Sequence, residues 1–283
     1  MGIFDNAKSL TIDNKDVKML KLDGATVFRI IDGIELTSDK TVLSYYDSDS
    51  CTLSAQLVDC EGNPMLESGK TIEFFKDNVS IGTATTNSNG IATKTINSNN
   101  EGTITFKAEY NSFTSNNITI EDIYKYYDCK TNDGNWNVPT RASVSFNSND
   151  GAYILGTAKT VTQPAYTIQC PTGSYSVELE ITEIQVSSTL ATQIGVEGVY
   201  LTSAQSRTEL RYYNNAVGVS TTFQLRIGDI IKFEYDKTNN IVTAYVNNQL
   251  IGSIEADSTY PGLTFRTYLD RCIGVKNMKI KEL

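Results

Sequence analysis

Short runs in which apolar and polar residues alternate recur along almost the whole chain of 283 residues. The run "IVTAYVNNQLIGSIEAD", residues 241–257, shows the pattern twice, on either side of Asn247, Asn248 and Gln249. A period of two places every second side chain on one face of a strand, and the Asn-Gly and Asp-Gly pairs found between such runs are turn formers. Almost no stretch has the longer period of a helix. The sequence therefore predicts an all-β protein.

Charge and histidine content exclude several kinds of chemistry. The chain has a net charge of -9, and its 24 Lys and Arg residues are scattered singly, so no basic stripe follows a phosphate backbone and we expect no nucleic acid partner. The lack of histidine removes Ser-His-Asp and Cys-His catalytic arrangements. No window approaches the ~18 apolar residues of a spanning helix, and "MGIFDNAKSL" has no secretion-signal pattern, so we expect no membrane insertion.

The five cysteines are Cys51, Cys60, Cys129, Cys170 and Cys272. Their odd number and the lack of a C-x-x-C pair argue against a zinc site and against a full disulfide framework. We expect reduced, mostly buried thiols and folding in a reducing cytoplasm, with one bridge, for example Cys51 to Cys60, as the alternative. We expect no cofactor. The turn "NSNDGAY", residues 147–153, offers oxygen ligands for calcium, but a solvated turn explains the same residues.

Breaks in the pattern divide the chain into three parts. Residues 1–34 contain the runs "SLTID", "VKMLKL" and "TVFRIID" and are too short to bury a core of their own. Residues 35–122 contain roughly seven short strands, the number of an immunoglobulin-like sandwich. Residues 123–283 hold longer alternating runs that end in "CIGVKNMKIKEL", enough for a two-sheet jelly roll. We expect the first part to dock on its neighbours or on another chain.

The second part carries a recognisable order of motifs: "DCEGNP", "TIEFF", "IGTATTNSNGIAT" and "GTITFKAEY". This order resembles the bacterial immunoglobulin-like domains of invasins and of many phage structural proteins. The resemblance implies a spacer or adhesive module without catalysis. The paired cysteines and core Trp of antibody-type domains are missing, so no disulfide between the sheets is implied.

The third part contains "GDIIKFEYD", "IVTAYVNNQLIG" and "IGVKNMKI" in that order. This succession resembles the concanavalin-like and laminin-G-like sandwiches. The resemblance implies a jelly roll from families that mostly bind glycans or protein surfaces and include a minority of glycosidases. The hairpin of residues 241–257 is then expected as an inner-sheet element.

One segment of the third part bears on catalysis. The run "ELEITE", Glu178 to Glu183, resembles the Glu-x-Asp-x-x-Glu signature of jelly-roll glycosidases, in which the first acid is the nucleophile and the last the acid/base. Glu180 replaces the middle Asp. In a regular strand Glu178 and Glu180 share a face and Glu183 lies on the other, unless a bulge reunites them. We therefore expect solvated strand carboxylates and no catalytic residue.

A carbohydrate site is expected from aromatic rings near hydrogen-bonding side chains, because a ring packs on the apolar face of a sugar while polar groups bind its hydroxyls. The candidates are Arg211, Tyr213, Asn214 and Trp136. Arg211 and Tyr213 share one strand face, whereas Tyr212 falls on the face of Leu210. Core packing is the alternative for Trp136 and for one of the two tyrosines.

Together these features predict a non-enzymatic virion structural protein of a tailed phage, assembled in the host cytoplasm. The opening "SLTIDNKDVKMLKLDGATVF" resembles those of phage tail or fibre proteins. We expect residues 1–34 to contact other virion proteins, the third part to bind a host cell-surface glycan, and the chain to form a homo-oligomer, with a trimer as one arrangement. The alternatives are a cell-surface adhesin and a jelly-roll glycoside hydrolase.

Overall fold

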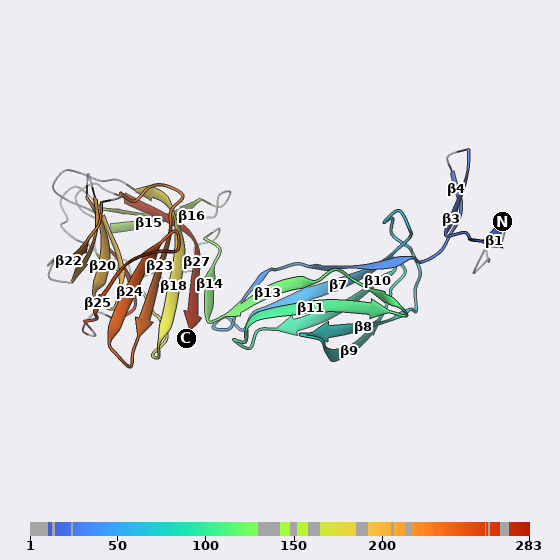
Figure 1. Ribbon diagram of the computed structural model, residues 1–283, viewed down its shortest axis with the longest axis horizontal. Coiled ribbons are helices and arrows are strands. Elements are labelled where there is room, and N and C mark those ends of the chain that lie inside the picture. Colours follow the sequence, from blue (N-terminus) through green and yellow to red (C-terminus); the bar gives the residue numbers. More distant parts are fainter. Residues whose placement is uncertain are drawn as a thin grey trace. The chain divides into compact units, whose positions relative to one another are not determined.

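The structure is a computed structural model. It describes residues 11–12, 15–23, 25–129, 142–147, 152–157, 165–184, 192–204, 207–212, 217–222, 224–257, 259, 261–266 and 272–283. The secondary-structure elements of these residues are all β-strands, and the chain divides into two compact units, Met1–Asp122 and Ile123–Leu283 (Figure 1). The all-β prediction is confirmed: a small N-terminal β segment precedes an immunoglobulin-like sandwich, and a larger lectin-like jelly roll follows. Within the described residues, no helix is long and apolar enough to cross a membrane.

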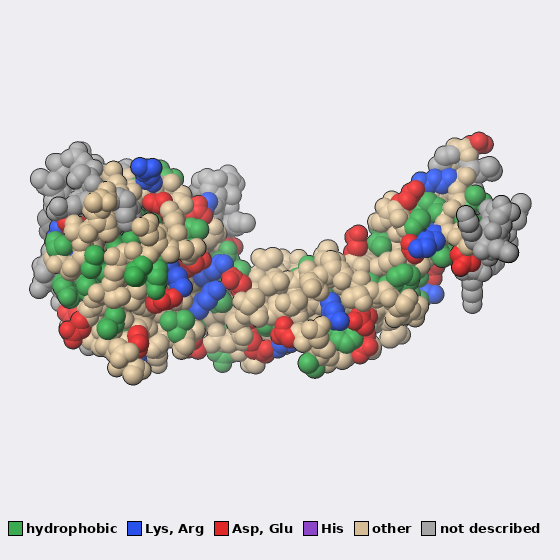
Figure 2. All heavy atoms as spheres, in the orientation of Figure 1, with side chains coloured by type: hydrophobic (Ala, Val, Ile, Leu, Met, Phe, Trp, Pro, Cys, Tyr) green, Lys and Arg blue, Asp and Glu red, His purple; other side chains and the backbone are tan. Residues whose placement is uncertain are grey.

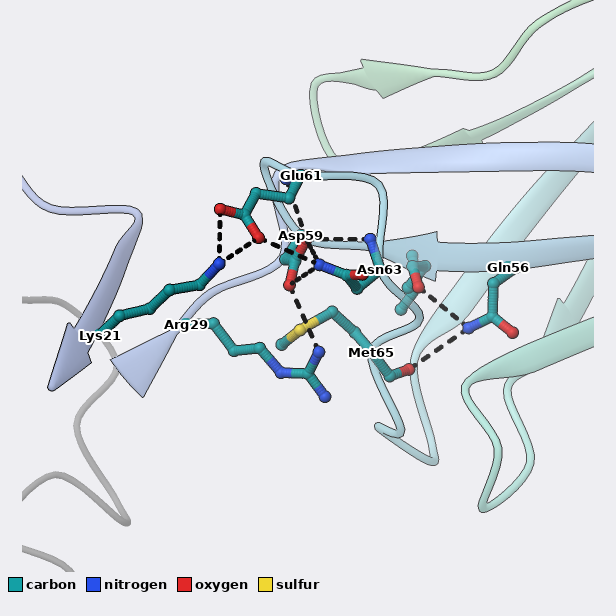
Figure 3. A network of polar contacts seen from close by, with 8 residues as sticks. Lys21, Arg29, Gln56, Asp59, Glu61, Asn63 and Met65 are labelled. Carbon is teal, nitrogen blue, oxygen red and sulfur yellow. Dashed lines mark hydrogen bonds and ion pairs between the residues drawn. The ribbon is translucent and has the colours of Figure 1, made fainter. Parts of the chain in front are cut away.

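Two small antiparallel pairs precede the first sandwich. They are β1 (Thr11–Ile12) with β2 (Lys15–Asp16), and β3 (Met19–Leu22) with β4 (Ala25–Arg29). The β3–β4 hairpin reaches the sandwich through two ion pairs, Lys21 Nζ to Glu61 Oε2 at 2.7 Å and Arg29 Nη1 to Asp59 Oδ2 at 3.3 Å (Figure 3). Phe28 is buried. The segment thus contacts its neighbour within the same chain.

The immunoglobulin-like unit packs two antiparallel sheets face to face. One sheet has the order β10-β7-β5, and the other β6-β13-β11-β8-β9 with β12 paired to β11. Their bounds are β5 Gly33–Ser38, β6 Val42–Ser44, β7 Ser50–Val58, β8 Thr71–Lys76, β9 Val79–Thr85, β10 Ile91–Asn97, β11 Gly102–Tyr110, β12 Phe113–Thr114 and β13 Ile118–Ile123. Alternate residues such as Leu53, Leu57, Phe74 and Phe106 are completely buried between the sheets. The alternation read from the sequence therefore builds this core directly.

The expected boundary between residues 34 and 35 falls inside a strand. Gly33 and Ile34 already pair with Val58 and Leu57, so β5 begins two residues before it. The reason is that Ile34 is itself buried in the core of the sandwich. The N-terminal segment is therefore shorter than the sequence pattern indicated.

A buried carboxylate closes the loop after β7. Asp59 Oδ1 accepts hydrogen bonds from the backbone N–H of Glu61 at 2.9 Å and of Asn63 at 3.0 Å. Burial alone would raise the pKa of Asp59, but these bonds, with those from the side chains of Asn63 and Arg29, bring it below its usual value. The ionised carboxylate of Asp59 thus stabilises this loop through the contacts that Figure 3 shows.

The second unit is a sandwich of an eight-stranded and a six-stranded antiparallel sheet. The eight-stranded sheet has the order β15-β16-β27-β18-β23-β24-β25, with β14 paired to β27, and the six-stranded jelly-roll sheet has the order β17-β26-β19-β20-β21-β22. In the first sheet the bounds are β14 Lys125–Tyr127, β15 Ala142–Asn147, β16 Ala152–Thr157, β18 Tyr175–Ile184, β23 Ile230–Asp236, β24 Ile241–Val246, β25 Gln249–Glu255 and β27 Cys272–Glu282. In the second they are β17 Ala165–Ile168, β19 Thr192–Val196, β20 Val199–Ala204, β21 Arg207–Tyr212, β22 Val217–Ser220 and β26 Leu263–Arg266.

The hairpin of residues 241–257 forms strands β24 and β25. Its two-residue turn has φ 50° at Asn247 and 64° at Asn248, the left-handed pair that suits a tight hairpin and that Asn tolerates. The strands lie at one end of the strand order, so the hairpin is an edge element and not the interior element expected from the sequence. Its apolar face, with Val242, Ala244 and Ile251, packs into the core.

All five cysteines are free thiols, as expected. Cys51, Cys129 and Cys170 are buried, Cys272 is half-buried and Cys60 is exposed. The alternative bridge between Cys51 and Cys60 is not formed, because Cys51 points into the core of the sandwich while Cys60 lies in the exposed loop after β7.

The outer face of the eight-stranded sheet is charged and partly exposed. Its ion pairs join Lys232 to Glu234 at 2.5 Å and Lys276 to Glu180 at 3.1 Å, and each partner keeps between 28% and 34% of its side chain exposed. Figure 2 shows Lys and Arg side chains gathered over the region where Figure 1 labels β18 and β27. We call this surface the charged face. It is the ordinary half-solvated surface of an antiparallel sheet.

Candidate functional site

The central part of the six-stranded jelly-roll sheet, formed by β19, β20, β26 and the middle of β21, is buried on both faces. Its inner face carries apolar residues of the core, among them Ile194, Leu201, Leu210 and Phe265. The alternate positions form a second row of side chains, which we call the polar face: Gln193, Tyr200, Thr202, Glu209, Arg211 and Arg266. All except Arg211 are at most 4% exposed. A sandwich core requires only one buried face per sheet, so the burial of this second, polar face needs a separate explanation.

Strand register brings the polar face together. Gln193 lies opposite both Thr202 and Arg266, and Thr202 lies opposite Glu209. In the next row Tyr200 lies opposite Arg211. Directly opposite side chains on antiparallel strands are about 5 Å apart at Cβ, so one small ligand spans several of them.

Hydrogen bonds and ring contacts fix these side chains. Gln193 Nε2 donates to Thr202 Oγ1 at 3.0 Å, and Arg211 Nε donates to Glu209 Oε2 at 2.7 Å, with a second bond from Nη2 to the same oxygen. The Arg266 guanidinium lies 4.5 Å from the centroid of the Tyr200 ring, within the range of a cation–π contact. The polar face is therefore preorganised.

Gly195 makes room for the ring of Tyr200. A Cβ at Gly195 would lie 2.7 Å from Tyr200 Cδ1 and 2.0 Å from the carbonyl oxygen of Val199. Neither contact is tolerable, so only glycine fits at this position. The Tyr200 ring thus lies over the strand next to its own, in the direction of Arg266.

Burying these polar groups is costly. A carboxylate moved into a low-dielectric interior loses solvation worth several kcal/mol, which an ion pair only partly restores. The backbone groups of β19, β20, β21 and β26 pair with one another along the sheet. Buried polar groups held in place by hydrogen bonds make this face the candidate binding site.

Of the four carbohydrate-site residues expected from the sequence, only Arg211 is among the residues that the structure describes. Arg211 lies on the polar face, where a quarter of its side chain is exposed. Tyr213, Asn214 and Trp136 lie outside the described residues, as does the central part of the proposed calcium turn, residues 148–151. Among the described residues, no cluster of three or more Cys, Asp or Glu side chains is arranged to hold a metal ion.

Two expectations for this strand need correction. Tyr212 does not pack in the core with Leu210, because it is the last residue of β21 and is 36% exposed. Arg211 is not an independent surface donor, because it pairs with Glu209, whose side chain is 1% exposed. Truncating Arg211 is therefore expected to reduce the stability of the unit.

Sequence reasoning missed Gln193, Tyr200, Thr202, Glu209 and Arg266. The alternation in "TQIGVEGVYLTS" and "RTELRYY" is that of a half-solvated strand, and polar residues on the outer face are normal there. The one local signal for a buried face is the type of residue at these positions. They are Gln, Tyr, Thr, Glu and Arg, and none is Lys. That signal is too weak to separate a buried polar face from a solvated one.

Strand β18 departs from regular alternation at the carboxylates of the glycosidase-like motif. Its register against β27 shifts between Ile181 and Glu183, so that both Thr182 and Glu183 adjoin Gly274. Cys272 Sγ donates to Glu183 Oε1 at 3.0 Å. The bulge therefore returns Glu183 to the charged face, together with Glu178 and Glu180, and the expectation of opposite faces is wrong.

Comparison with known proteins supports the reading of the first sandwich. Residues 32–122 match the family model of invasin domain 3. This region is similar to an invasin domain. The match covers a minority of the chain, and it starts next to β5, the first strand of the sandwich. No curated protein sequence matches the chain.

Solved structures resemble part of the chain at low sequence identity. A carbohydrate-binding module of Bacillus subtilis has 9% identity and a TM-score of 0.41, covering 52% of this chain and 96% of the module. The Lotus tetragonolobus seed lectin has 11% identity and a TM-score of 0.41, covering 56% and 96%. A Bacillus licheniformis β-glucanase has 12% identity and a TM-score of 0.41, covering 56% and 97%. The strand order and register given above remain the basis for the site.

Proposed function

We propose that this chain is a non-enzymatic adhesive protein whose jelly-roll unit binds a carbohydrate at the polar face, while the immunoglobulin-like unit serves as a spacer. The observation that carries the proposal is the set of buried, preorganised polar side chains on β19, β20, β21 and β26. Glutamate, glutamine and arginine are suited to bind adjacent sugar hydroxyls.

The ligand enters where the polar face is open. Arg211, near the end of β21, is the partly exposed residue of the polar face, and it lies opposite Tyr200 and bonds to Glu209. In this proposal the sugar binds first at Arg211, and Tyr213 and Asn214 follow two and three residues later in the sequence. These two residues, with Trp136, remain candidates for the outer part of the site.

A binding assay with matched variants tests the proposal. The labelled full chain is screened on a glycan array, and the bound glycans are titrated against Arg211→Lys and the control Arg226→Lys. Lys keeps the charge but loses the planar fork of donors, so we expect Arg211→Lys to weaken binding about tenfold or more, and the control to bind normally. Equal affinity in both variants would refute the assignment of the site.

The finer form of the proposal is a phage virion protein. It is supported by the resemblance of residues 9–28 to the openings of tail and fibre proteins and by the pairing of a spacer with a binding head. Residues 1–30 are then the attachment segment, which joins the chain to other virion proteins and to its own copies. Electron microscopy of virions with a labelled chain tests this role, and deletion of residues 1–30 should abolish incorporation while both sandwiches stay folded.

A glycoside hydrolase is the second candidate, favoured by the bulge in β18. The bulge places Glu178, Glu180 and Glu183 on one face, as a carboxylate pair for hydrolysis requires. Against it, Glu180 is paired with Lys276 and bonded by Asn277, and it stands where the related motif has Asp. Release of reducing ends from a polysaccharide panel that disappears in Glu178→Gln, but not in the control Glu255→Gln, would establish the enzyme.

A further inference from the structure

A separate cavity of about 520 Å³ opens at one end of the jelly-roll sandwich. Its lining comes from the segment that follows β17, from the β19–β20 turn, from the end of β23 and from the start of β26. Ile168, Cys170, Pro171, Tyr235 and Pro261 supply most of its apolar wall. A cavity of this size and character is in the range that holds a small organic molecule.

Glu197 is the acidic group of this cavity. It occupies the first position of the two-residue turn between β19 and β20, with φ 47°, a left-handed conformation that glutamate rarely adopts. Four bonds hold it there: its carboxylate accepts from the Tyr175 hydroxyl at 2.6 Å and from the Gly262 N–H at 2.8 Å, while its own backbone bonds to Gly262 O and to Asp257 N–H. Glu197 is 6% exposed.

The carboxylate is anchored through one oxygen. Both the Tyr175 and the Gly262 bond end on Oε1, and no described residue donates to Oε2. No lysine or arginine within the described part of the chain forms an ion pair with Glu197; Lys237, which lines the cavity, donates its Nζ to the carbonyl oxygen of Thr172 at 2.6 Å. A buried carboxylate without a cation is costly, so the cavity favours a positively charged guest.

The surrounding acids are held neutral. Burial raises the pKa of Cys170 to about 12, and burial and the negative charge of Glu197 raise the pKa values of Tyr175 and Tyr235. The thiol and the two phenols of this region therefore stay neutral near neutral pH, so Glu197 and Lys237 are the two charged side chains among the lining residues, and the Lys237 ammonium is bonded to the Thr172 carbonyl.

We propose that this cavity is a second ligand site, which binds a small organic cation: an ammonium or guanidinium group against Glu197 Oε2, with an apolar body between Ile168, Pro171 and Tyr235. The site lies in the same unit as the polar face but shares no residue with it. It is therefore independent of the proposed carbohydrate binding.

Three probes of one shape test the proposal: benzylammonium, benzyl alcohol and benzoate, each titrated into the full chain and followed by ligand-observed NMR. We expect benzylammonium to bind at least about tenfold more tightly than benzyl alcohol, and benzoate not to bind. In Glu197→Gln the amide keeps both bonds to Oε1, so the fold is retained and the preference for the cation should disappear. The control Glu255→Gln, an exposed residue of β25 outside the cavity, should keep it.

A second variant covers the case in which Glu197→Gln fails to fold. Gln169 lines the cavity but is exposed, so Gln169→Trp narrows the cavity without disturbing the core, and we expect it to weaken benzylammonium binding severalfold. Equal affinity for the cation and the alcohol, absence of binding by all three probes, or unchanged binding in Gln169→Trp with Glu197 intact would each overturn the proposal. Unchanged benzylammonium binding in Arg211→Lys would separate this site from the carbohydrate site.

Discussion

Both units bury carboxylates in turns, but only the jelly-roll unit, within the described residues, also buries an ion pair between residues of a strand. In the immunoglobulin-like unit the buried carboxylates serve turns: Asp59 accepts the N–H groups of Glu61 and Asn63, and Asp122 accepts those of Asn99 at 2.7 Å and Glu101 at 3.2 Å. In the jelly-roll unit Glu209 and Arg266 lie within strands whose backbone is already paired. The buried carboxylates of the first unit hold turns in place, whereas the Glu209 carboxylate forms an ion pair with Arg211 on the face of the candidate site.

The same contrast separates the two outer faces of the jelly roll. The charged face holds ion pairs that water reaches, and the polar face holds an ion pair that water reaches only from the arginine side. The residue types do not distinguish these faces, since each carries a glutamate paired with a lysine or arginine. The degree of burial distinguishes them, and it makes the polar face the candidate site.

The largest effect expected is on the Arg211–Glu209 pair. Arg211→Ala leaves the Glu209 carboxylate buried without its arginine, and breaking a buried pair from one side costs about 3–5 kcal/mol. Lys232→Ala, which breaks the exposed pair with Glu234, should cost less than about 1 kcal/mol. Chemical unfolding gives the free energy of unfolding of each variant. It is followed by the fluorescence of Trp136, the single tryptophan, which belongs to residues 123–283. Equal costs would remove the distinction between the two faces.

A smaller effect is expected at Asp59. Asp59→Ala deprives the Glu61 and Asn63 N–H groups of their acceptor and should destabilise the immunoglobulin-like unit by about 1–3 kcal/mol, without changing carbohydrate binding. The folded pKa of Asp59 is depressed, so its stabilisation is present above the unfolded pKa and is lost as pH falls through the folded value. Hydrogen exchange of the two units between pH 7 and pH 3 measures this. A pH-independent difference between wild type and Asp59→Ala over that range would contradict the ionic role.

Substitutions in the outer part of the site are expected to weaken glycan binding without changing stability. Tyr213→Ala should weaken glycan binding by about 1–3 kcal/mol and leave the melting temperature nearly unchanged, if its ring stacks on the sugar. A core tyrosine would instead lose about 3–5 kcal/mol of stability on truncation. Melting and binding measured on the same variant decide between these roles, and unchanged melting with unchanged binding would remove Tyr213 from the site.

The sequence predicts the fold better than the site, for a physical reason. Alternation determines which side chains of β7 or β24 face a core, because the period of a strand is two. The Asn247–Asn248 pair predicts the turn between β24 and β25. Whether the other face of a strand meets water depends on residues distant in sequence, so Gln193 and Glu209 read like solvated positions. The bulge that moves Glu183 to the charged face depends equally on pairing with Gly274.

The smallest effect expected concerns the thiols, and it tests burial in both units at once. Burial raises the pKa of Cys129 and of Cys170 to about 12, which leaves on the order of one thiolate in ten thousand at pH 8, and the thiolate is the species that an alkylating reagent attacks. Burial also raises the pKa of Cys272 to about 12, with the Glu183 carboxylate adding to the effect, so its half exposure does not make it reactive. Cys60 is exposed, and its modification should leave stability unchanged. Mass spectrometry after brief iodoacetamide treatment of the native chain should therefore find Cys60 modified first and Cys129 and Cys170 unmodified, with all five labelled after unfolding. Rapid labelling of Cys170 in the native chain would show that this thiol is accessible and reactive, and would contradict the burial of the cavity wall beside Glu197.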